Sequence, residues 1–488
     1  MSESKAQGTK SITSAFIWKL CERFGVQGSQ FVLQIVLARI LDPEHYGVLS
    51  LMIIFVNLAN VFIQHGFNTA LVQNKDVTEE DYSSVFWIVL IVATVIYAVL
   101  FFSAPVISVF YKMPDLTAPF RALCLMLFPG ALNSVQIAIV SRKMDFKHIF
   151  RSNITAILIA GVAGIAAAIA GWGLWALVIQ TFLNVAVATA VMWFSVRWRP
   201  RLVCNAQRVK VLFSYGWKLM VSHFIDVLYQ DIRSLAIGKK YNSETLGYYN
   251  RGKQFPQFII NAINSTVQSV MLPAMSKKQD EKTKIKAMMR NSISLSSYII
   301  FPIMAGLAAV AKPLVSIILT DKWLPCVPYM QIYCFTLAFY PVHSCNLQAI
   351  NAMGRSDIFL KLEIFKKALG MVLLVIALVF FRTPIAIAMT GVFSTGINIV
   401  VNALPNKKLI NYSVFEQLRD FVPQFLLSLT MFGGLLCLGL LNLNSYVILI
   451  CQVVIGAVFY IGMSVVLRMY PFGILLKTVK DIFSKKRS

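Results

Sequence analysis

Four apolar segments of the chain carry polar side chains at nearly every helical turn. Within residues 15–40, 47–70, 213–238 and 249–273, these positions are spaced by three and four residues, which places them on one face of a helix. The four stripes are Lys19, Arg23, Gln27, Gln30 and Gln34; Asn57, Asn60, Gln64 and Asn68; Lys218, Ser222, Asp226, Gln230 and Arg233; and Gln254, Gln257, Asn261, Asn264 and Gln268. Because such side chains are costly in hydrocarbon, we expect them to face a wet cavity or one another.

The charges on and beside these stripes are mostly basic, which favours an anionic ligand. Guanidinium groups bind a pyrophosphate by paired, charge-assisted hydrogen bonds, and amides on the same face can contact sugar hydroxyls. The predicted substrate-binding residues are Lys19, Arg23, Gln27, Gln30, Asn60, Gln64, Asn68, Arg233, Arg251, Lys253, Asn261, Asn264 and Gln268. We expect no catalytic residues, no metal site and no cofactor.

Three carboxylates beside the stripes, Glu22, Asp226 and Asp231, are candidates for coupling to H⁺ or Na⁺, since buried carboxylates change their pKa readily. They can equally be fixed partners of the arginines. Lys218 and Arg251, near segment ends, can instead extend to the headgroups, and the basic residues of the first segment can pair with an adjacent carboxylate.

The composition indicates a membrane protein, because 58% of the 488 residues are hydrophobic and only 14% are charged. Apolar runs long enough to cross a bilayer recur along the whole chain, and they predict an all-α integral membrane protein with about 14 transmembrane helices. The expected spans are residues 15–40, 47–70, 82–110, 118–140, 150–170, 173–196, 213–238, 249–273, 291–319, 327–350, 361–381, 384–403, 421–441 and 446–468.

The net charge of +24 follows the predicted topology. Most lysines and arginines outside the spans fall on the N-terminus, on alternate connections and on the C-terminal tail, which places both termini in the cytoplasm. We therefore expect no nucleic-acid partner. The basic, apolar-patterned tail is expected to lie along the anionic cytoplasmic leaflet.

The chain also contains an internal repeat of about 200 residues. Pro43-Glu44-His45-Tyr46-Gly47 is echoed by Ser243-Glu244-Thr245-Leu246-Gly247, and Pro129 pairs with Pro341. Each half holds six spans, so the halves are related by an axis along the membrane normal, with a cavity between two bundles. The predicted organisation is residues 1–14 as a cytoplasmic N-terminus, 15–200 as an N-lobe, 201–212 as a cytoplasmic linker, 213–405 as a C-lobe, 421–468 as an appended helix pair and 469–488 as the tail.

Several motifs resemble those of a known family over nearly the whole chain. They are Leu37-Ala38-Arg39-Ile40-Leu41-Asp42-Pro43, Gly66-Phe67-Asn68-Thr69-Ala70-Leu71-Val72-Gln73, Arg142-Lys143-Met144-Asp145-Phe146, Gly171-Trp172-Gly173-Leu174-Trp175-Ala176-Leu177, Trp198-Arg199-Pro200 and Leu246-Gly247-Tyr248-Tyr249-Asn250-Arg251. The chain resembles the Wzx-type polysaccharide flippases, particularly the WzxC-like branch.

This resemblance implies the V-shaped fold of the multidrug/oligosaccharidyl-lipid/polysaccharide exporters in a bacterial inner membrane. The implied substrate is an undecaprenyl-pyrophosphate-linked oligosaccharide for capsule, exopolysaccharide or O-antigen, moved by ion-coupled alternating access. Membrane lipids and the polymerase and export proteins of the same pathway are the further partners it suggests. Where the family usually has Asn-x-Asp, this chain has Asp231-Ile232-Arg233, so no family coupling role is carried over to that position.

Two other functions remain as alternatives. A multidrug antiporter would share the fold, although its substrates are often cationic and suit a basic cavity poorly. A membrane enzyme would need convergent catalytic groups on a sizeable external loop, and the expected connections offer none.

We expect Arg23→Ala and Arg233→Ala to abolish export while leaving the protein in the membrane, because each removes a cation from the predicted binding surface. Surface polysaccharide and membrane abundance of the variants are the measurements. Full export by both variants would contradict the assignment.

Overall fold

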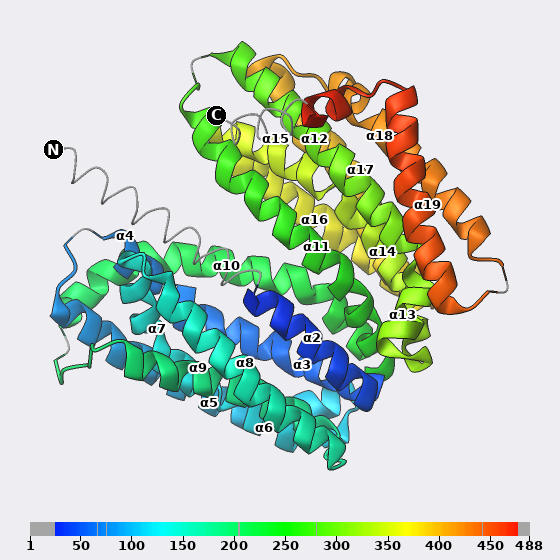
Figure 1. Cartoon of the computed structure of the whole chain (residues 1–488). Helices are drawn as coiled ribbons and strands as arrows, with labels where there is room; N and C mark the ends of the chain where they lie inside the picture. The colour runs from blue at the N-terminus through cyan, green and yellow to red at the C-terminus, as the bar shows by residue number, and fades with distance from the viewer. Residues whose placement is uncertain are drawn as a thin grey trace, which may run out of the picture. The chain divides into compact units, whose positions relative to one another are not determined.

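The computed structural model describes residues 25–65, 67–74, 76–203, 205–279, 281–441 and 443–476, and all its elements there are helices (Figure 1). They are α2 (Gln27–Ile40), α3 (Pro43–Asn60), the π-helix η2 (Val61–His65), α4 (Phe67–Gln73), α5 (Glu79–Tyr111), the 3₁₀ helix η3 (Pro114–Leu116), α6 (Thr117–Cys124), α7 (Leu127–Arg142), α8 (Phe146–Ile169), α9 (Leu174–Ser195), α10 (Ala206–Lys240), α11 (Ser243–Ser276), α12 (Lys282–Ala309), α13 (Ala311–Leu319), the 3₁₀ helix η4 (Asp321–Cys326), α14 (Val327–Ala338), α15 (Tyr340–Ala352), α16 (Ser356–Phe380), α17 (Pro384–Ile410), α18 (Val414–Leu438) and α19 (Ser445–Val466).

Every expected span after the first coincides with one helix or with consecutive helices. The span 118–140 divides into α6 and α7, and the span 327–350 divides into α14 and α15. Pro129 and Pro341 stand in the first turn of the second helix of each pair, where the missing N–H of proline breaks no helical hydrogen bond. The fold class predicted from hydropathy is therefore confirmed as all-helical.

Within the described residues, nine helical stretches are long and apolar enough to cross a membrane. They are Pro43–Gln64, Glu79–Tyr111, Pro114–Arg142, Phe146–Ile169, Leu174–Ser195, Lys282–Ala309, Pro384–Ile410, Val414–Leu438 and Ser445–Val466. The chain is thus a multi-pass membrane protein, while the expected count of about 14 spans stays a prediction. Helices α10 and α11 are long enough to span, at 35 and 34 residues, but their polar stripes lower their hydropathy.

The internal repeat is visible in the order of the elements. In each half a 3₁₀ helix, η3 or η4, precedes a short helix, α6 or α14, which is followed by a second short helix and two long ones. Pro105 lies inside α5, and its sequence counterpart Pro313 lies in α13, directly after α12 ends. The two halves therefore share a helical order as well as sequence motifs.

The contacts divide the chain into two units, Met1–Gly247 and Tyr248–Ser488. In unit 1, α8 packs along α9, α5 packs against α6 and α7, and α10 packs against α3, η2, α4 and α5. In unit 2, α12 packs along α18, and α16 packs along α17. The predicted lobes 15–200 and 213–405 follow the sequence repeat rather than these contacts, and their limits stay predictions.

Hydrogen bonds between side chains and backbone fix the helix starts at one end of unit 1. Thr78 and Asp81 form a reciprocal capping box at the start of α5. The Asp81 carboxylate, only 1% exposed, also accepts hydrogen bonds from Arg208 Nε at 2.9 Å and Nη2 at 2.7 Å. This paired contact joins the first turn of α5 to the first turn of α10.

A cluster of buried amides joins α15, α17 and α18 inside unit 2. Asn346 Nδ2 donates to Gln417 Oε1 at 2.9 Å, and Asn406 Nδ2 donates to Asn346 Oδ1 at 2.7 Å. All three side chains are at most 2% exposed. Since a buried amide without a partner is costly, these bonds specify how the three helices pack.

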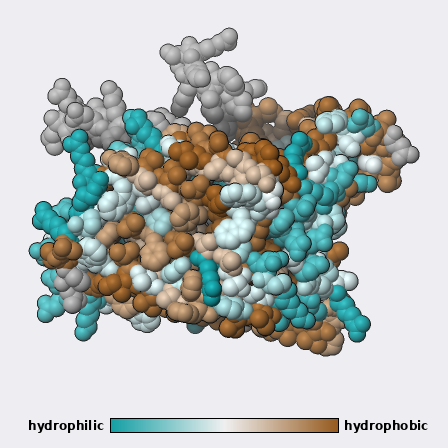
Figure 2. Space-filling model, turned by 90° about the horizontal axis from the view of Figure 1, so that it is seen from below, coloured by the Kyte–Doolittle hydropathy of each residue, from teal (hydrophilic) through white to brown (hydrophobic). Residues whose placement is uncertain are grey.

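The surface has the pattern expected of a membrane protein. Figure 2 shows a face on which hydrophobic residues gather across the middle and hydrophilic residues gather toward the two ends. Many large apolar side chains on the helices are exposed, among them Phe102 at 75% and Val109 at 78% on α5 and Phe194 at 88% on α9. In water such a surface would be unfavourable, so these helices face lipid.

We expect Asn346→Leu to destabilise the protein by about 1–3 kcal/mol, because the amides of Gln417 and Asn406 lose their partner in a buried site. Thermal unfolding of the purified protein in detergent measures this effect. The matched control is Asn351→Leu on the same helix, whose side chain makes no hydrogen bond within the described part of the chain. Equal melting temperatures for the two variants would contradict the role of the cluster.

Candidate functional site

The polar stripe of the second predicted span runs along α3, η2 and α4. A methyl group placed on Gly130 of α7 would lie 3.6 Å from Asn60 Oδ1 and 3.8 Å from Gln64 Nε2. Both amides are half-buried, as is Asn68, whereas Asn57 is exposed. The side chains of Asn60 and Gln64 therefore face helix α7 inside unit 1 rather than lipid.

The π-helix η2 interrupts this stripe at Val61–His65. An extra residue in a helical turn changes the direction in which the following side chains point, and such turns recur at functional sites. Sequence periodicity does not distinguish five π-helical residues from an α-helix, so this feature could not be predicted. It lies between Asn60 and Asn68, two of the predicted binding residues.

Helix α10 brings a second stripe alongside the first. It packs against α3, η2 and α4, and the rings of Phe62 and Phe224 lie 5.4 Å apart between η2 and α10. Asp226, Asp231 and Arg233 on α10 are half-buried, and the Arg233 guanidinium lies 5.9 Å from the ring centre of Tyr229. The structure thus places two predicted polar helices in contact in unit 1.

Helix α2 carries the described part of the remaining stripe of unit 1. It packs against α8, where the side chain of Leu33 contacts Gly161. Gln27 is exposed and Gln30 is half-buried. Lys19, Glu22 and Arg23 lie outside the described residues, so their roles stay predictions.

In unit 2, the predicted residue Arg251 is buried, at 4% exposed. Its Nη1 donates to Gln254 Oε1 at 2.6 Å, and its guanidinium lies 5.0 Å from the ring centre of Trp323. A methyl group on the adjacent Gly252 would lie 2.8 Å from the carbonyl oxygen of Cys326, so α11 approaches η4 closely. These contacts favour a role for Arg251 in holding α11 against η4.

The other predicted residues of α11 are more accessible. Lys253 is half-buried, and Asn261 is exposed and accepts a hydrogen bond from Gln257 Nε2 at 2.8 Å. The side chains of Asn264 and Gln268 lie outside the described part of the structure. Their assignment to the substrate therefore stays a prediction.

Inside unit 1, the first residues of α11 approach the first residues of α3 closely at two glycines. A methyl group on Gly47 would lie 1.7 Å from the carbonyl oxygen of Ser243, and one on Gly247 would lie 2.1 Å from that of Pro43. Ser243 Oγ also donates to Glu44 Oε1 at 3.0 Å. Because Pro43 and Gly47 are the sequence counterparts of Ser243 and Gly247, the contact is reciprocal, like one across a two-fold axis.

The stripes offer amides, a few cations and two described carboxylates, which suits recognition of a polar ligand. Within the residues that the structure describes, no group of three or more His, Cys, Asp or Glu could hold a metal ion. The amides and cations on α3, α10 and α11 can bind a polar ligand by hydrogen bonds.

Residues 36–328 match the profile of a family described as polysaccharide biosynthesis protein. The chain belongs to this family of polysaccharide biosynthesis proteins. The match covers more than half of the sequence, including all helices from α3 to η4. The family resemblance inferred from the sequence motifs is thereby confirmed.

Proteins similar to this chain come from several bacteria. The chain is 24% identical to the teichuronic acid biosynthesis protein TuaB of Bacillus subtilis, over 85% of this chain and 86% of TuaB. It is 22% identical to the succinoglycan biosynthesis transport protein ExoT of Rhizobium meliloti, over 72% of this chain and 71% of ExoT. The lipopolysaccharide biosynthesis protein WzxC of Escherichia coli is 23% identical, over 72% of this chain and 71% of WzxC.

Solved structures identify the fold. The lipid II flippase MurJ, in an inward closed conformation, is similar with a TM-score of 0.71 and 16% identity, covering 93% of this chain and 99% of MurJ. An inward-facing multidrug resistance MATE transporter of the MOP superfamily is similar with a TM-score of 0.57 and 13% identity, covering 86% of this chain and 98% of that protein. The exporter fold predicted from the resemblance is confirmed, since the chain shares the fold of these two proteins.

We expect Gly47→Ala and Gly247→Ala to lower stability by about 1–3 kcal/mol, because each methyl group would overlap a backbone carbonyl oxygen that has little room to move. Thermal unfolding of the purified variants measures the effect. Gly396→Ala is the control, since a methyl group there would meet no atom within 4 Å. A melting temperature unchanged from the wild type in both test variants would contradict the close approach of α3 and α11.

Proposed function

We propose that this protein is a flippase that moves a lipid-linked oligosaccharide from the cytoplasmic to the periplasmic leaflet of a bacterial inner membrane. The family match over residues 36–328 carries the proposal. Relatives named for the synthesis of teichuronic acid, succinoglycan and lipopolysaccharide support a role in polysaccharide assembly, and ExoT is named as a transport protein. The fold shared with the lipid II flippase MurJ suits a substrate made of a lipid, a diphosphate and sugars.

The polar helices suit such a substrate. In unit 1, the amides of Asn60 and Gln64 are proposed to contact sugar hydroxyls, and Arg233 is a cation for an undecaprenyl-linked pyrophosphate. In unit 2, Asn261 and Lys253 offer an amide and a cation of the same kinds. The apolar chain of the carrier lipid can remain in the bilayer during transfer, since only the polar head needs a polar path.

We further propose that transfer proceeds by alternating access, as in other transporters built from two repeated halves.

Coupling and assembly complete the proposal. Asp226 and Asp231 are half-buried carboxylates on α10 and are the described candidates for H⁺ or Na⁺ coupling.

The polymerase and export proteins of the same pathway are the proposed partners on the external side, because they would consume the delivered repeat unit. Both termini are proposed to lie in the cytoplasm.

Depletion of the protein in its native host tests the function. Lipid-linked repeat units are expected to accumulate on the cytoplasmic leaflet, with loss of surface polysaccharide. Unchanged intermediate and polymer, together with greater drug sensitivity, would contradict the flippase function and favour a multidrug antiporter.

A further inference from the structure

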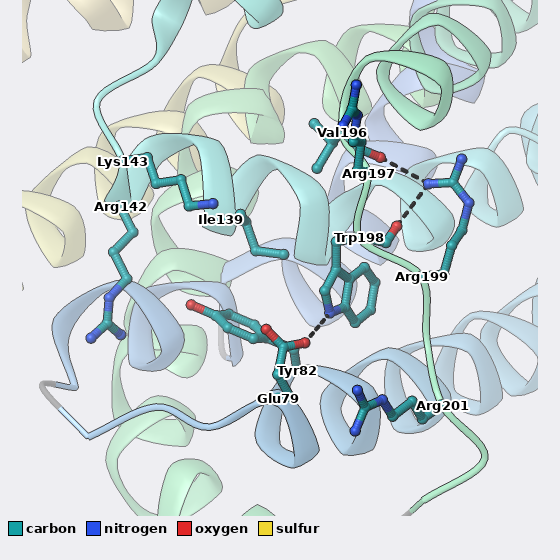
Figure 3. A pocket seen from close by; sticks show the side chains of 10 residues that line it. All are labelled: Glu79, Tyr82, Ile139, Arg142, Lys143, Val196, Arg197, Trp198, Arg199 and Arg201. Carbon is teal, nitrogen blue, oxygen red and sulfur yellow. Dashed lines mark hydrogen bonds between the residues drawn. The ribbon is translucent and has the colours of Figure 1, made fainter.

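A basic pocket of about 630 Å³ lies at one end of unit 1, where α5 begins and where α7 and α9 end (Figure 3). Its lining includes the cations Arg142, Lys143, Arg197, Arg199 and Arg201 and the single carboxylate of Glu79. The volume falls within the roughly 300–1,000 Å³ that is usual for ligand sites. The pocket thus brings together two motifs of the family resemblance, Arg142-Lys143 and Trp198-Arg199-Pro200. The sequence predicts no role in binding for either motif.

The loop that forms one wall is held in a defined position by the start of α5. Trp198 Nε1 donates to Glu79 Oε2 at 2.9 Å, and Trp87 Nε1 donates to the carbonyl oxygen of Arg201 at 2.8 Å. The backbone N–H of Arg201 donates to Ser83 Oγ at 3.1 Å. The pocket is therefore built before any ligand arrives, which lowers the entropic cost of binding.

Two of the cations are positioned by hydrogen bonds to backbone carbonyl oxygens. Arg199 Nη2 donates to the carbonyl oxygen of Trp193 at 2.7 Å, and its guanidinium lies 5.0 Å from the ring centre of that tryptophan. Arg142 Nη1 donates to the carbonyl oxygen of Asn74 at 2.7 Å. Carbonyl oxygens and rings orient a guanidinium without neutralising it, so the contacts of Arg199 leave its positive charge available to an anion.

The other three cations lining the pocket are Lys143, Arg197 and Arg201. Within the part of the chain that the structure describes, the side chains of Lys143, Arg197 and Arg201 make no hydrogen bond or ion pair. Figure 3 shows the cationic side chains spread around Tyr82 and Trp198, whose rings lie 6.3 Å apart. With five cations against one carboxylate, the pocket favours an anion that can accept several hydrogen bonds at once.

The surroundings indicate that this anion belongs to a lipid. Phe194 at the end of α9 is 88% exposed, and Leu202 in the loop that follows α9 is 89% exposed. Large apolar side chains therefore flank the basic residues of this loop on both sides. Exposed apolar side chains next to arginines and a tryptophan are typical of the level where hydrocarbon meets headgroups. A ligand here would have its charge in the pocket and its acyl chains beside Phe194 and Leu202.

We propose that the pocket binds the phosphate of an anionic phospholipid headgroup from the adjacent leaflet. The concentration of cations places it on the cytoplasmic side, where anionic lipids meet basic pockets between helices. The bound phospholipid stays in place rather than being transported, and it links the start of α5 to the ends of α7 and α9.

The test measures lipid retention by the full-length protein in native mass spectrometry, with phosphatidylglycerol or cardiolipin compared with phosphatidylcholine. We expect the wild type to retain the anionic lipid preferentially. The double variant Arg197→Gln with Arg201→Gln should bind it about tenfold or more weakly, since each basic residue near an anionic membrane surface changes affinity about fivefold. Lys143→Gln, a single change at the other wall, should show a smaller loss in the same direction.

Arg151→Gln is the matched control, because Arg151 is an exposed arginine at the start of α8 outside the pocket. An equal loss in this variant would assign the effect to general surface charge and overturn the proposal, as would equal retention of phosphatidylcholine. Competition by inorganic phosphate at equal concentration would show a site for soluble anions. Preferential binding of a short polyprenyl diphosphate would reassign the pocket to the transported lipid.

Discussion

The arrangement of this protein depends on the cost of placing hydrogen-bonding groups in hydrocarbon. A polar side chain on a membrane helix must find a partner, a wet surface or the headgroup layer. Some polar side chains find a partner: inside unit 2, the amide of Asn346 forms hydrogen bonds with the amides of Gln417 and Asn406. Asn60 and Gln64 lie against α7, and the arginines between residues 197 and 201 gather where the helices end.

The same constraint explains why polar stripes are concentrated on few helices. Helices α5, α8 and α9 are apolar enough to face lipid, and they enclose their part of unit 1 with a hydrophobic surface. Helices α10 and α11 carry polar residues along their length, so they are not among the nine stretches that are apolar enough to cross a membrane. A transporter needs both kinds of helix, since one kind faces lipid and the other provides a path for a polar ligand.

Sequence patterns predicted much of this fold. Every expected span after the first coincides with one helix or with consecutive helices, and the counterpart motifs at Pro43–Gly47 and Ser243–Gly247 contact each other reciprocally. The break between α14 and α15 was missed, because a proline in a first helical turn resembles a proline within a continuous span.

The candidate site was predictable only in part, because helical periodicity gives the face of a residue but not the helix opposite it. Arg251 illustrates this limit, since its position beside a stripe suggested a cavity and its contacts with Gln254 and Trp323 favour packing. The basic pocket joins residues more than 50 positions apart, such as Lys143 and Arg197, and no local pattern connects them. For the buried amide cluster, the sequence does contain a pattern: Asn402 and Asn406 are four residues apart, which places both on one face of α17.

The central claim is that the protein transfers a lipid-linked oligosaccharide between leaflets. The most direct measurement places such a lipid in proteoliposomes containing the purified protein and follows the fraction that an added glycosidase can reach over time. The account predicts that the protected fraction falls in vesicles containing the protein and stays constant in vesicles without it. A protected fraction that stays constant in both, while the same vesicles transport a cationic drug, would contradict it.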